Sequence, residues 1–148
     1  MKILDMSCGN RAIWFDKHHP FVSYIDIRES VKPVRVMDST DMREFGDGIF
    51  DLIVFDPPHM NCGRNSGLSR SYGHHTTAQI LNIIEGSGKE AHRVSKFNAL
   101  MALKWNDHDI KLKKVFELLP QWEPLFGHLT KNGPTAKSQT YWCMMRRL

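Results

Sequence analysis

The residues best suited to chemistry stand together at the end of an apolar run. Residues 52–55 are apolar, and Asp56, Pro57, Pro58 and His59 follow them directly. A short apolar stretch of this kind is typical of a buried strand, and proline ends strand pairing because it has no N–H to donate. In open α/β sheets, ligands bind beyond the carboxyl ends of the strands. The sequence therefore predicts that these four residues belong to an active site.

The same tetrapeptide resembles the Asp/Asn/Ser-Pro-Pro-aromatic signature of S-adenosylmethionine-dependent methyltransferases that modify exocyclic amino groups, such as adenine N6 and cytosine N4 in DNA. His59 stands where Tyr, Phe or Trp is more usual. The resemblance implies that Asp56, Pro57, Pro58 and His59 are catalytic and that S-adenosylmethionine is the methyl donor. The alternative is purely structural, with the prolines ending a core strand and Asp56 capping a turn.

A physical reason can be given for each residue of the signature. An exocyclic amine on a base is a poor nucleophile because its lone pair is delocalised into the ring, so the nitrogen must become pyramidal to attack. The Asp56 carboxylate and the Pro57 carbonyl are suitable acceptors for the amine hydrogens, and the prolines limit how far that carbonyl can move. His59 would stack on the base and hold it outside its helix.

The first strand predicted from the sequence also ends in an acid. Residues 1–6 read as a short, mostly apolar strand, residues 7–10 contain a glycine turn, and residues 11–15 have helical potential. A strand, a glycine turn and a helix open a nucleotide-binding βα unit. The segment resembles motif I of the class I methyltransferases, although Ser7 and Arg11 stand where that motif often has glycines. The residues that the resemblance assigns to the cofactor are Asp5, Met6, Ser7, Cys8 and Gly9.

Two further predicted strands, residues 21–26 and 34–38, end in acids. Asp26 follows Gly9 at close to the roughly 20 residues that separate the glycine turn from the ribose-binding acid in dinucleotide folds. We therefore expect Asp26 and the adjacent Ile27 to bind the cofactor ribose, and Asp38 with Ser39 to lie near its adenine. Either acid could instead cap a local structure. Together with Asp5 and Asp56, these acids would line one edge of a parallel sheet.

The second half of the chain completes an α/β pattern. The elements expected there are a helix at 76–95 with a break at 86–88, a strand at 98–103, a helix at 110–119, and hairpin strands at 124–129 and 140–145. The ending resembles the sixth and seventh strands of class I methyltransferases. The whole chain is also similar to short phage and prophage methyltransferases. The prediction is a Rossmann-like seven-stranded sheet, mostly parallel with an antiparallel C-terminal hairpin and helices on both faces.

Two regions provide candidate contacts for a substrate. The loop 60–73 is rich in Gly, Ser, Asn and Arg, and Arg64 and Arg70 could meet phosphates while Tyr72 stacks on a base. Lys104 and Trp105 follow the predicted fifth strand, which places them beside Asp56. The alternatives are a solvated loop, a buried Trp105 and a solvated Lys104.

Composition limits the class of protein. A chain of 148 residues with 41% hydrophobic residues predicts a single domain, residues 1–148, without a separate target-recognition domain. A net charge of +4 suits a nucleic-acid partner. The pairs His18-His19 and His74-His75 lack a third ligand at suitable spacing, so no metal is predicted. No apolar run approaches the roughly 20 residues needed to span a membrane, and we expect a cytoplasmic protein.

These observations predict methyl transfer from S-adenosylmethionine to an exocyclic amine of a nucleobase, with adenine N6 in DNA as the first choice. The alternatives are adenine N6 or guanine N2 in RNA, a free small-molecule amine, and a cofactor-binding subunit that is inactive without a partner. The sequence begins at its first strand, without the helix that often precedes motif I. A second copy of the chain, a partner protein, or recognition by shape would then supply the missing surfaces.

Overall fold

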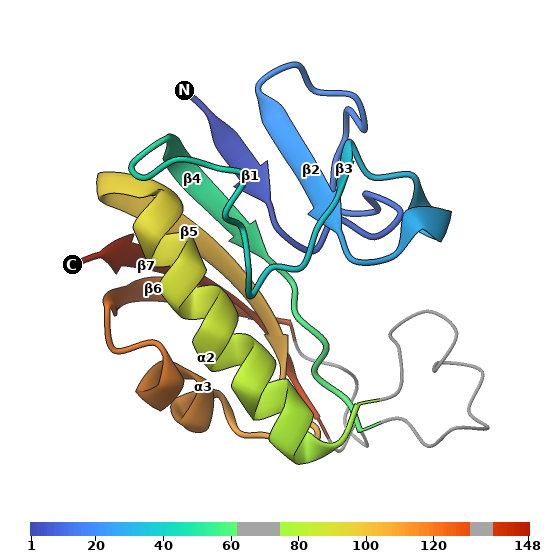
Figure 1. Cartoon of the computed structure of the whole chain (residues 1–148). Helices are drawn as coiled ribbons and strands as arrows, with labels where there is room; N and C mark the ends of the chain where they lie inside the picture. Colours follow the sequence, from blue (N-terminus) through green and yellow to red (C-terminus); the bar gives the residue numbers. More distant parts are fainter. Residues whose placement is uncertain (62–74, 131–137) are drawn as a thin grey trace.

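The sheet of this protein has seven strands in the order β3-β2-β1-β4-β5-β7-β6. The computed structural model describes residues 1–61, 75–130 and 138–148. The strands are β1 (Ile3–Asp5), β2 (Val22–Asp26), β3 (Arg35–Val36), β4 (Phe50–Phe55), β5 (Ser95–Asn106), β6 (Trp122–Thr130) and β7 (Thr140–Arg147). The strands from β1 to β5 pair in parallel, whereas β7 runs antiparallel to both β5 and β6. This arrangement confirms the predicted mostly parallel sheet with its C-terminal hairpin (Figure 1).

Two α-helices of the described residues lie on the same face of this sheet (Figure 1). They are α2 (Thr77–Val94) and α3 (Leu112–Leu118), and a short 3-10 helix, η1, spans Glu29–Val31. A capping box begins α2, in which the Thr76 side chain accepts from the Gln79 N–H and the Gln79 side chain accepts from the Thr76 N–H. Within the described ranges, no helix has the length and apolarity needed to cross a membrane.

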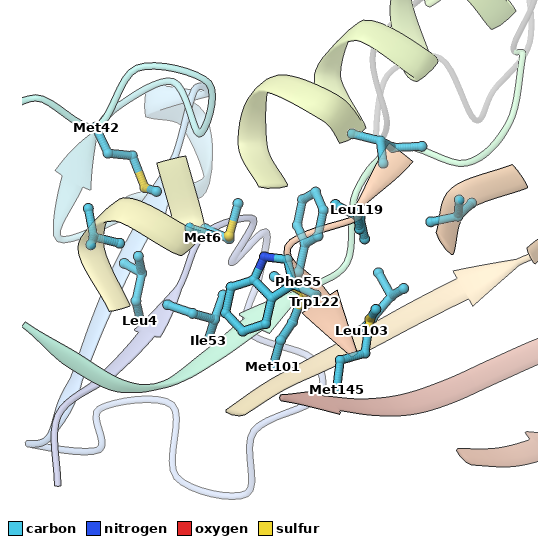
Figure 2. Close-up of a cluster of buried hydrophobic side chains, with 14 of the residues drawn as sticks. Leu4, Met6, Met42, Ile53, Phe55, Met101, Leu103, Leu119, Trp122 and Met145 are labelled. Carbon is cyan, nitrogen blue, oxygen red and sulfur yellow. The ribbon is translucent and has the colours of Figure 1, made fainter. Parts of the chain in front are cut away.

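The main core lies between the sheet and the two helices (Figure 2). The buried side of α2 carries Ile80, Ile84, Ala91 and Val94. The sheet contributes alternate residues of its central strands, because successive side chains of a strand point to opposite faces. These buried strand residues are Leu4, Ile53, Phe55, Met101, Leu103 and Met145. The residues that alternate with these in β4 and β5 therefore point to the opposite face of the sheet.

The other face of the sheet has no α-helix among the described residues, which corrects the prediction of helices on both faces. Trp14 covers part of it by packing against a cluster that contains Val22, Tyr24 and Val54. The helix expected at residues 11–15 is replaced by turns. Arg11 takes a left-handed conformation with φ of 55°, and its guanidinium donates to two backbone carbonyls. These tertiary hydrogen bonds outweigh the helical potential of the segment.

The break expected at residues 86–88 of α2 does not occur. Both glycines there serve close packing of an unbroken helix. A Cβ at Gly86 would lie 3.2 Å from Thr40, and a Cβ at Gly88 would overlap Leu119 of the segment after α3. The Gly88 carbonyl also accepts the indole N–H of Trp122 at 3.2 Å.

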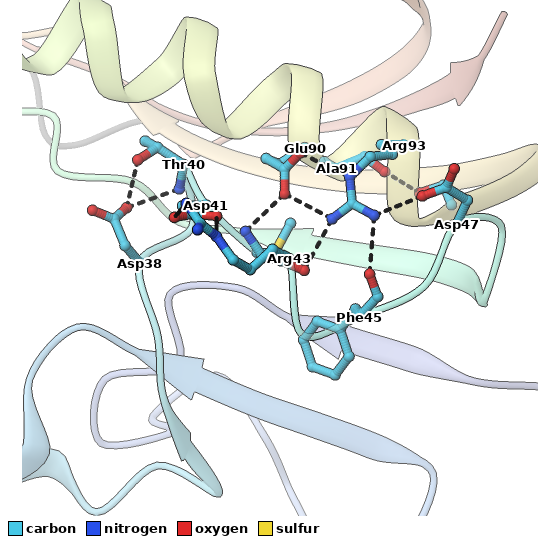
Figure 3. A network of polar contacts seen from close by, with 11 residues as sticks. Asp38, Thr40, Asp41, Arg43, Phe45, Asp47, Glu90, Ala91 and Arg93 are labelled. Atoms are coloured by element: carbon cyan, nitrogen blue, oxygen red, sulfur yellow. Dashed lines mark hydrogen bonds and ion pairs between the residues drawn. The ribbon is translucent and has the colours of Figure 1, made fainter.

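The turn after β3 is held against α2 by a group of polar contacts (Figure 3). Arg93 of α2 forms ion pairs with Glu90 and Asp47 and donates to the Met42 carbonyl. Glu90 in turn accepts the Met42 N–H at 2.7 Å. These contacts give the segment that follows Asp38 a fixed position beside the helix.

Candidate active site

Three of the four acids predicted to line one edge of the sheet approach one another. Asp5 ends β1, Asp26 ends β2, and Asp56 follows β4 directly. The Ser7 hydroxyl accepts the Asp56 N–H at 2.8 Å, and the Gly9 N–H donates to Asp26 at 2.9 Å, so the turn after β1 joins the other two strand ends. The charges of Asp56 and Asp26 both contribute to the pKa of Asp5. The acids therefore lie within electrostatic reach of one another.

Asp5 is the most deeply buried of these acids, with 1% of its surface exposed. Its Oδ1 accepts the Ser7 N–H at 3.2 Å, and its Oδ2 accepts the Trp14 indole N–H at 2.7 Å. Burial raises the pKa of Asp5 to about 6, and the nearby charges of Asp56 and Asp26 add to this effect, while the two hydrogen bonds oppose it. Asp5 is thus ionised at neutral pH at a cost in stability.

The rest of the turn after β1 contributes mainly backbone. Met6 and Cys8 are buried, and their N–H groups donate to the carbonyls of Val54 and Ile25. Burial raises the pKa of the Cys8 thiol to about 11, so the thiol stays protonated and unreactive at neutral pH. Gly9 adopts φ of 48°, the left-handed region that glycine tolerates best. The turn can therefore present its backbone to a ligand at close range.

Asp26 has the position expected for it but a different set of partners. Its two oxygens accept hydrogen bonds from the Arg28 Nε, from the Arg28 Nη2 and N–H, and from the Gly9 N–H, all at 2.9–3.0 Å. Burial alone would raise the pKa of Asp26, but the bonds from Arg28 and Gly9 outweigh it and lower that pKa. Ribose hydroxyls could reach this carboxylate only if Arg28 moved. Ile27, next to it, is 66% exposed and offers an apolar surface.

The Asp38 side chain caps a local turn, which was the alternative to a position near the cofactor adenine. Its Oδ1 accepts both the N–H and the hydroxyl of Thr40 at 2.8 Å. The Ser39 hydroxyl is hydrogen-bonded to the Ser87 hydroxyl of α2 at 2.7 Å. A hollow of about 370 Å³ borders this turn, which is within the size range of small-molecule sites. Its lining residues are Thr40, His75, Gln79, Asn82 and Ile83.

A second hollow of about 320 Å³ includes Lys2, Phe21 and Phe50 in its lining. These residues precede or begin β1, β2 and β4, so the hollow lies at the opposite edge of the sheet from the acids. Among residues 1–61, 75–130 and 138–148, no group of three His, Cys, Asp or Glu side chains could hold a metal ion.

Asp56 is paired with a lysine that the sequence analysis assigned to the substrate. The strand β5 extends to Asn106, so Lys104 lies inside the strand and not beyond its end. The Lys104 Nζ donates to Asp56 Oδ2 at 2.6 Å. The other oxygen, Oδ1, is buried and has no hydrogen-bond partner among the described residues.

His59 lies over the buried part of the site. Its ring packs edge-on against Trp105, with the centroids 6.0 Å apart, and its Nδ1 is 3.2 Å from the Pro57 carbonyl oxygen. Burial lowers the pKa of His59, so the ring is neutral at pH 7 and its Nδ1–H can donate to that carbonyl. Trp105 itself is fully buried and donates its indole N–H to the Ile110 carbonyl. Trp105 thus supports His59 from the core, which is the buried position given above as the alternative to a substrate contact.

Three of the predicted substrate residues, Arg64, Arg70 and Tyr72, lie outside the described residues. Conversely, Trp14 and Arg28 were not predicted to belong to the site. Arg28 could have been suspected because it stands two residues after Asp26, which lets its side chain turn back onto the acid. Trp14 gives no such signal, because nothing local indicates that its indole reaches Asp5.

No protein-family model matches the sequence, and no curated protein matches it significantly. Solved structures do match. A SAM-dependent methyltransferase from Methanosarcina mazei aligns with a TM-score of 0.68 and 15% identity over 99% of this chain and 92% of its own. The N-methyltransferase NodS from Bradyrhizobium japonicum, in complex with S-adenosylhomocysteine, aligns with a TM-score of 0.60 and 13% identity over 99% of this chain and 77% of its own.

The cyclase SpnF also aligns, with a TM-score of 0.66 and 11% identity over 99% of this chain and 74% of its own. SpnF is a [4+2]-cyclase, so the same fold accompanies more than one reaction. Identities this low relate the proteins by architecture alone. The chain has the fold of the class I S-adenosylmethionine-dependent methyltransferases.

Proposed function

We propose that this protein transfers a methyl group from S-adenosylmethionine to an exocyclic amino group of a nucleobase, with adenine N6 in DNA as the favoured acceptor. The observation that carries the proposal is Asp56 Oδ1, beside the Pro57 carbonyl after β4, which is buried and has no hydrogen-bond partner among the described residues. A buried acceptor without a donor is costly in a protein that has no use for it. An amine hydrogen would supply the missing donor.

The edge of the sheet fits S-adenosylmethionine in its chemistry. The cofactor carries a positive sulfonium, and Asp5 is an ionised carboxylate that burial and its neighbours destabilise. The left-handed Gly9 allows close approach of the backbone, and the exposed Ile27 can pack against a flat ring. The residues that would hold the cofactor are Asp5, Met6, Ser7, Cys8, Gly9, Asp26, Ile27, Asp38, Ser39 and Asp56. When bound, the cofactor supplies an electrophilic methyl group.

The residues of the chain would orient the acceptor amine. Asp56 Oδ1 accepts one amine hydrogen, and the Pro57 carbonyl accepts the other with the lone pair that His59 leaves unused. Two acceptors on the amine draw the nitrogen toward a pyramidal geometry and expose its lone pair. The neutral ring of His59 offers a stacking surface for the base. Holding both reactants in near-attack geometry can remove roughly 7–11 kcal/mol from the barrier.

A second candidate function is a cofactor-binding subunit that acts only with a partner, either another copy of the chain or a different protein. The Asp26–Arg28 pair favours it only through the need for a partner, because the acid expected to bind ribose is already fully hydrogen-bonded and Arg28 would have to be drawn away before the cofactor binds. The unpartnered Asp56 Oδ1 opposes it, since a subunit without chemistry gains nothing from an unsatisfied buried acceptor.

Labelled methyl transfer by the purified chain separates these functions. DNA, RNA and nucleosides are offered as acceptors to the natural protein, to Asp56→Ala and to Asp51→Ala. Asp51 is a matched control because it lies at the other end of β4 and also pairs with a lysine of β5. The proposal expects transfer that Asp56→Ala abolishes and Asp51→Ala retains. Cofactor binding without transfer to any acceptor would support the subunit, and transfer to RNA alone would replace DNA as the substrate.

A further inference from the structure

The ion pair between Lys104 and Asp56 has no part in the chemistry proposed above. Its Nζ–Oδ2 distance of 2.6 Å is among the shortest in the structure, and both side chains are mostly buried, with exposed fractions of 27% and 19%. Burying two charges costs solvation energy that such a pair recovers only with good geometry. Because the other oxygen of Asp56, Oδ1, has no hydrogen-bond partner among the described residues, this pair requires an explanation.

The pairing of β4 with β5 brings the two side chains together. Val54 lies opposite Ala102 and Phe55 opposite Leu103, so positions 56 and 104 come next on the two neighbouring strands. Since Phe55 and Leu103 both enter the main core, Lys104 projects from the other face of the sheet. On the side of β5 away from β4, Lys104 pairs with Trp142 of β7, so the lysine stem lies between two neighbouring strands.

The two oxygens of Asp56 have different surroundings. Oδ2 is held by the Lys104 ammonium, whereas Oδ1 is buried and has no partner among the described residues. The Asp56 backbone N–H is fixed separately by the Ser7 hydroxyl at 2.8 Å. With the backbone and one oxygen fixed, the direction of the second oxygen is set.

We infer that Lys104 is a positioning residue: it holds Asp56 in one rotamer, so that Oδ1 points at the acceptor amine. This inference rests on the proposed function for the identity of the amine. It differs from the substrate contact that the sequence predicted for Lys104, because the ammonium is directed at Asp56 and not at a ligand. The other titratable groups that face Asp56 are Asp5 at the end of β1 and His59 in its own loop. Neither can replace the cation, since Asp5 is an acid and His59 is neutral.

Replacing Lys104 tests the inference through kcat and KM. Lys104→Met should lower kcat by about 10- to 100-fold, the value of one charge-assisted hydrogen bond, while KM for the nucleic acid stays within about twofold. Lys104→Arg keeps the charge and should recover most of the loss. Lys96→Met is the matched control, since Lys96 also lies on β5 and pairs with Asp51 of β4 at 2.7 Å.

A second measurement does not depend on turnover. Crystal structures of the variants compare the rotamer of Asp56, which should change in Lys104→Met and stay the same in Lys96→Met. If the natural protein methylates nothing but the Asp56 rotamer changes in Lys104→Met, the proposed function fails and the positioning role stands. An unchanged Asp56 rotamer in Lys104→Met, or a rise in KM with kcat unchanged, would overturn the role of Lys104 even in an active enzyme.

Discussion

Replacing Asp5 by Asn should stabilise the protein above pH 6. Asp5 is 1% exposed, and burial raises its pKa from 3.8 to about 6, with the charges of Asp56 and Asp26 contributing. A difference of about two pKa units corresponds to about 3 kcal/mol between the two protonation states, at roughly 1.4 kcal/mol per unit. Asparagine resembles the neutral carboxyl in shape and in its single acceptor oxygen, so the substitution removes the cost of the buried charge.

The sign follows from proton binding in the two states. Below pH 4 Asp5 is neutral in both the folded and the unfolded chain, so it carries no penalty. Between pH 4 and 6 the folded protein keeps the proton that the unfolded chain releases, and the free energy of unfolding falls as pH rises. Above pH 6 Asp5 is ionised in both states and the full penalty of about 3 kcal/mol is present. The gain from Asp5→Asn should therefore grow through this window and then level off.

Urea unfolding at pH 4, 5, 6, 7 and 8 measures this difference directly. The natural protein and Asp5→Asn should have similar midpoints at pH 4 and separate steadily up to pH 7, with equal m values. Asp51→Asn is the control, because the Lys96 ammonium lowers the pKa of Asp51 and neutralising it brings no gain. If Asp5→Asn is less stable than the natural protein at pH 8, then the bonds of Asp5 to Ser7 and Trp14 outweigh its burial, and the reasoning is wrong.

Three further substitutions test other parts of the structure. His59→Phe should keep most of the methyl-transfer rate and His59→Ala should lose about tenfold or more, because stacking needs the ring; equal rates in the two variants would exclude stacking. Gly88→Ala should destabilise the protein by about 1–3 kcal/mol in urea unfolding, because a Cβ there meets buried Leu119, whereas Gly86→Ala, with only a 3.2 Å contact to Thr40, should cost less. Arg28→Ala should tighten S-adenosylmethionine binding by about tenfold in calorimetry, because it frees Asp26; weaker binding would mean that Arg28 itself holds the cofactor.

The strand ends were predictable from the sequence because their signal is local. An apolar run followed by Asp marks β1, β2 and β4, and parallel strands bring their carboxyl ends to one edge. The partners of those acids depend on contacts between distant residues. Trp14 reaches Asp5 only because Arg11 turns the segment back on itself, and Lys104 reaches Asp56 only because β5 continues beyond residue 103. Neither event leaves a periodic pattern in the sequence.

The glycines of α2 show the same limit. Gly86 and Gly88 reduce helix propensity, so the sequence alone predicts a break. The structure keeps the helix continuous because the missing side chains make room for Thr40 and Leu119. The packing that explains these glycines comes from segments before and after the helix, which no window of neighbouring residues contains.

The acids at this edge of the sheet are compensated by cations and donors to different degrees, and this difference supports the proposed reaction. Asp26 is compensated by Arg28, and one oxygen of Asp56 by Lys104. Two groups remain uncompensated among the described residues. The ionised Asp5 has hydrogen bonds but no cation bonded to it, and Asp56 Oδ1 has no hydrogen-bond donor. Asp5 pairs with Val54 of the adjacent strand, and Val54 stands two residues before Asp56, so the two uncompensated groups lie side by side. A cation beside Asp5 would compensate its charge, and an amine would supply the donor for Asp56 Oδ1. A sulfonium and an amine are the two reactants of methyl transfer to nitrogen.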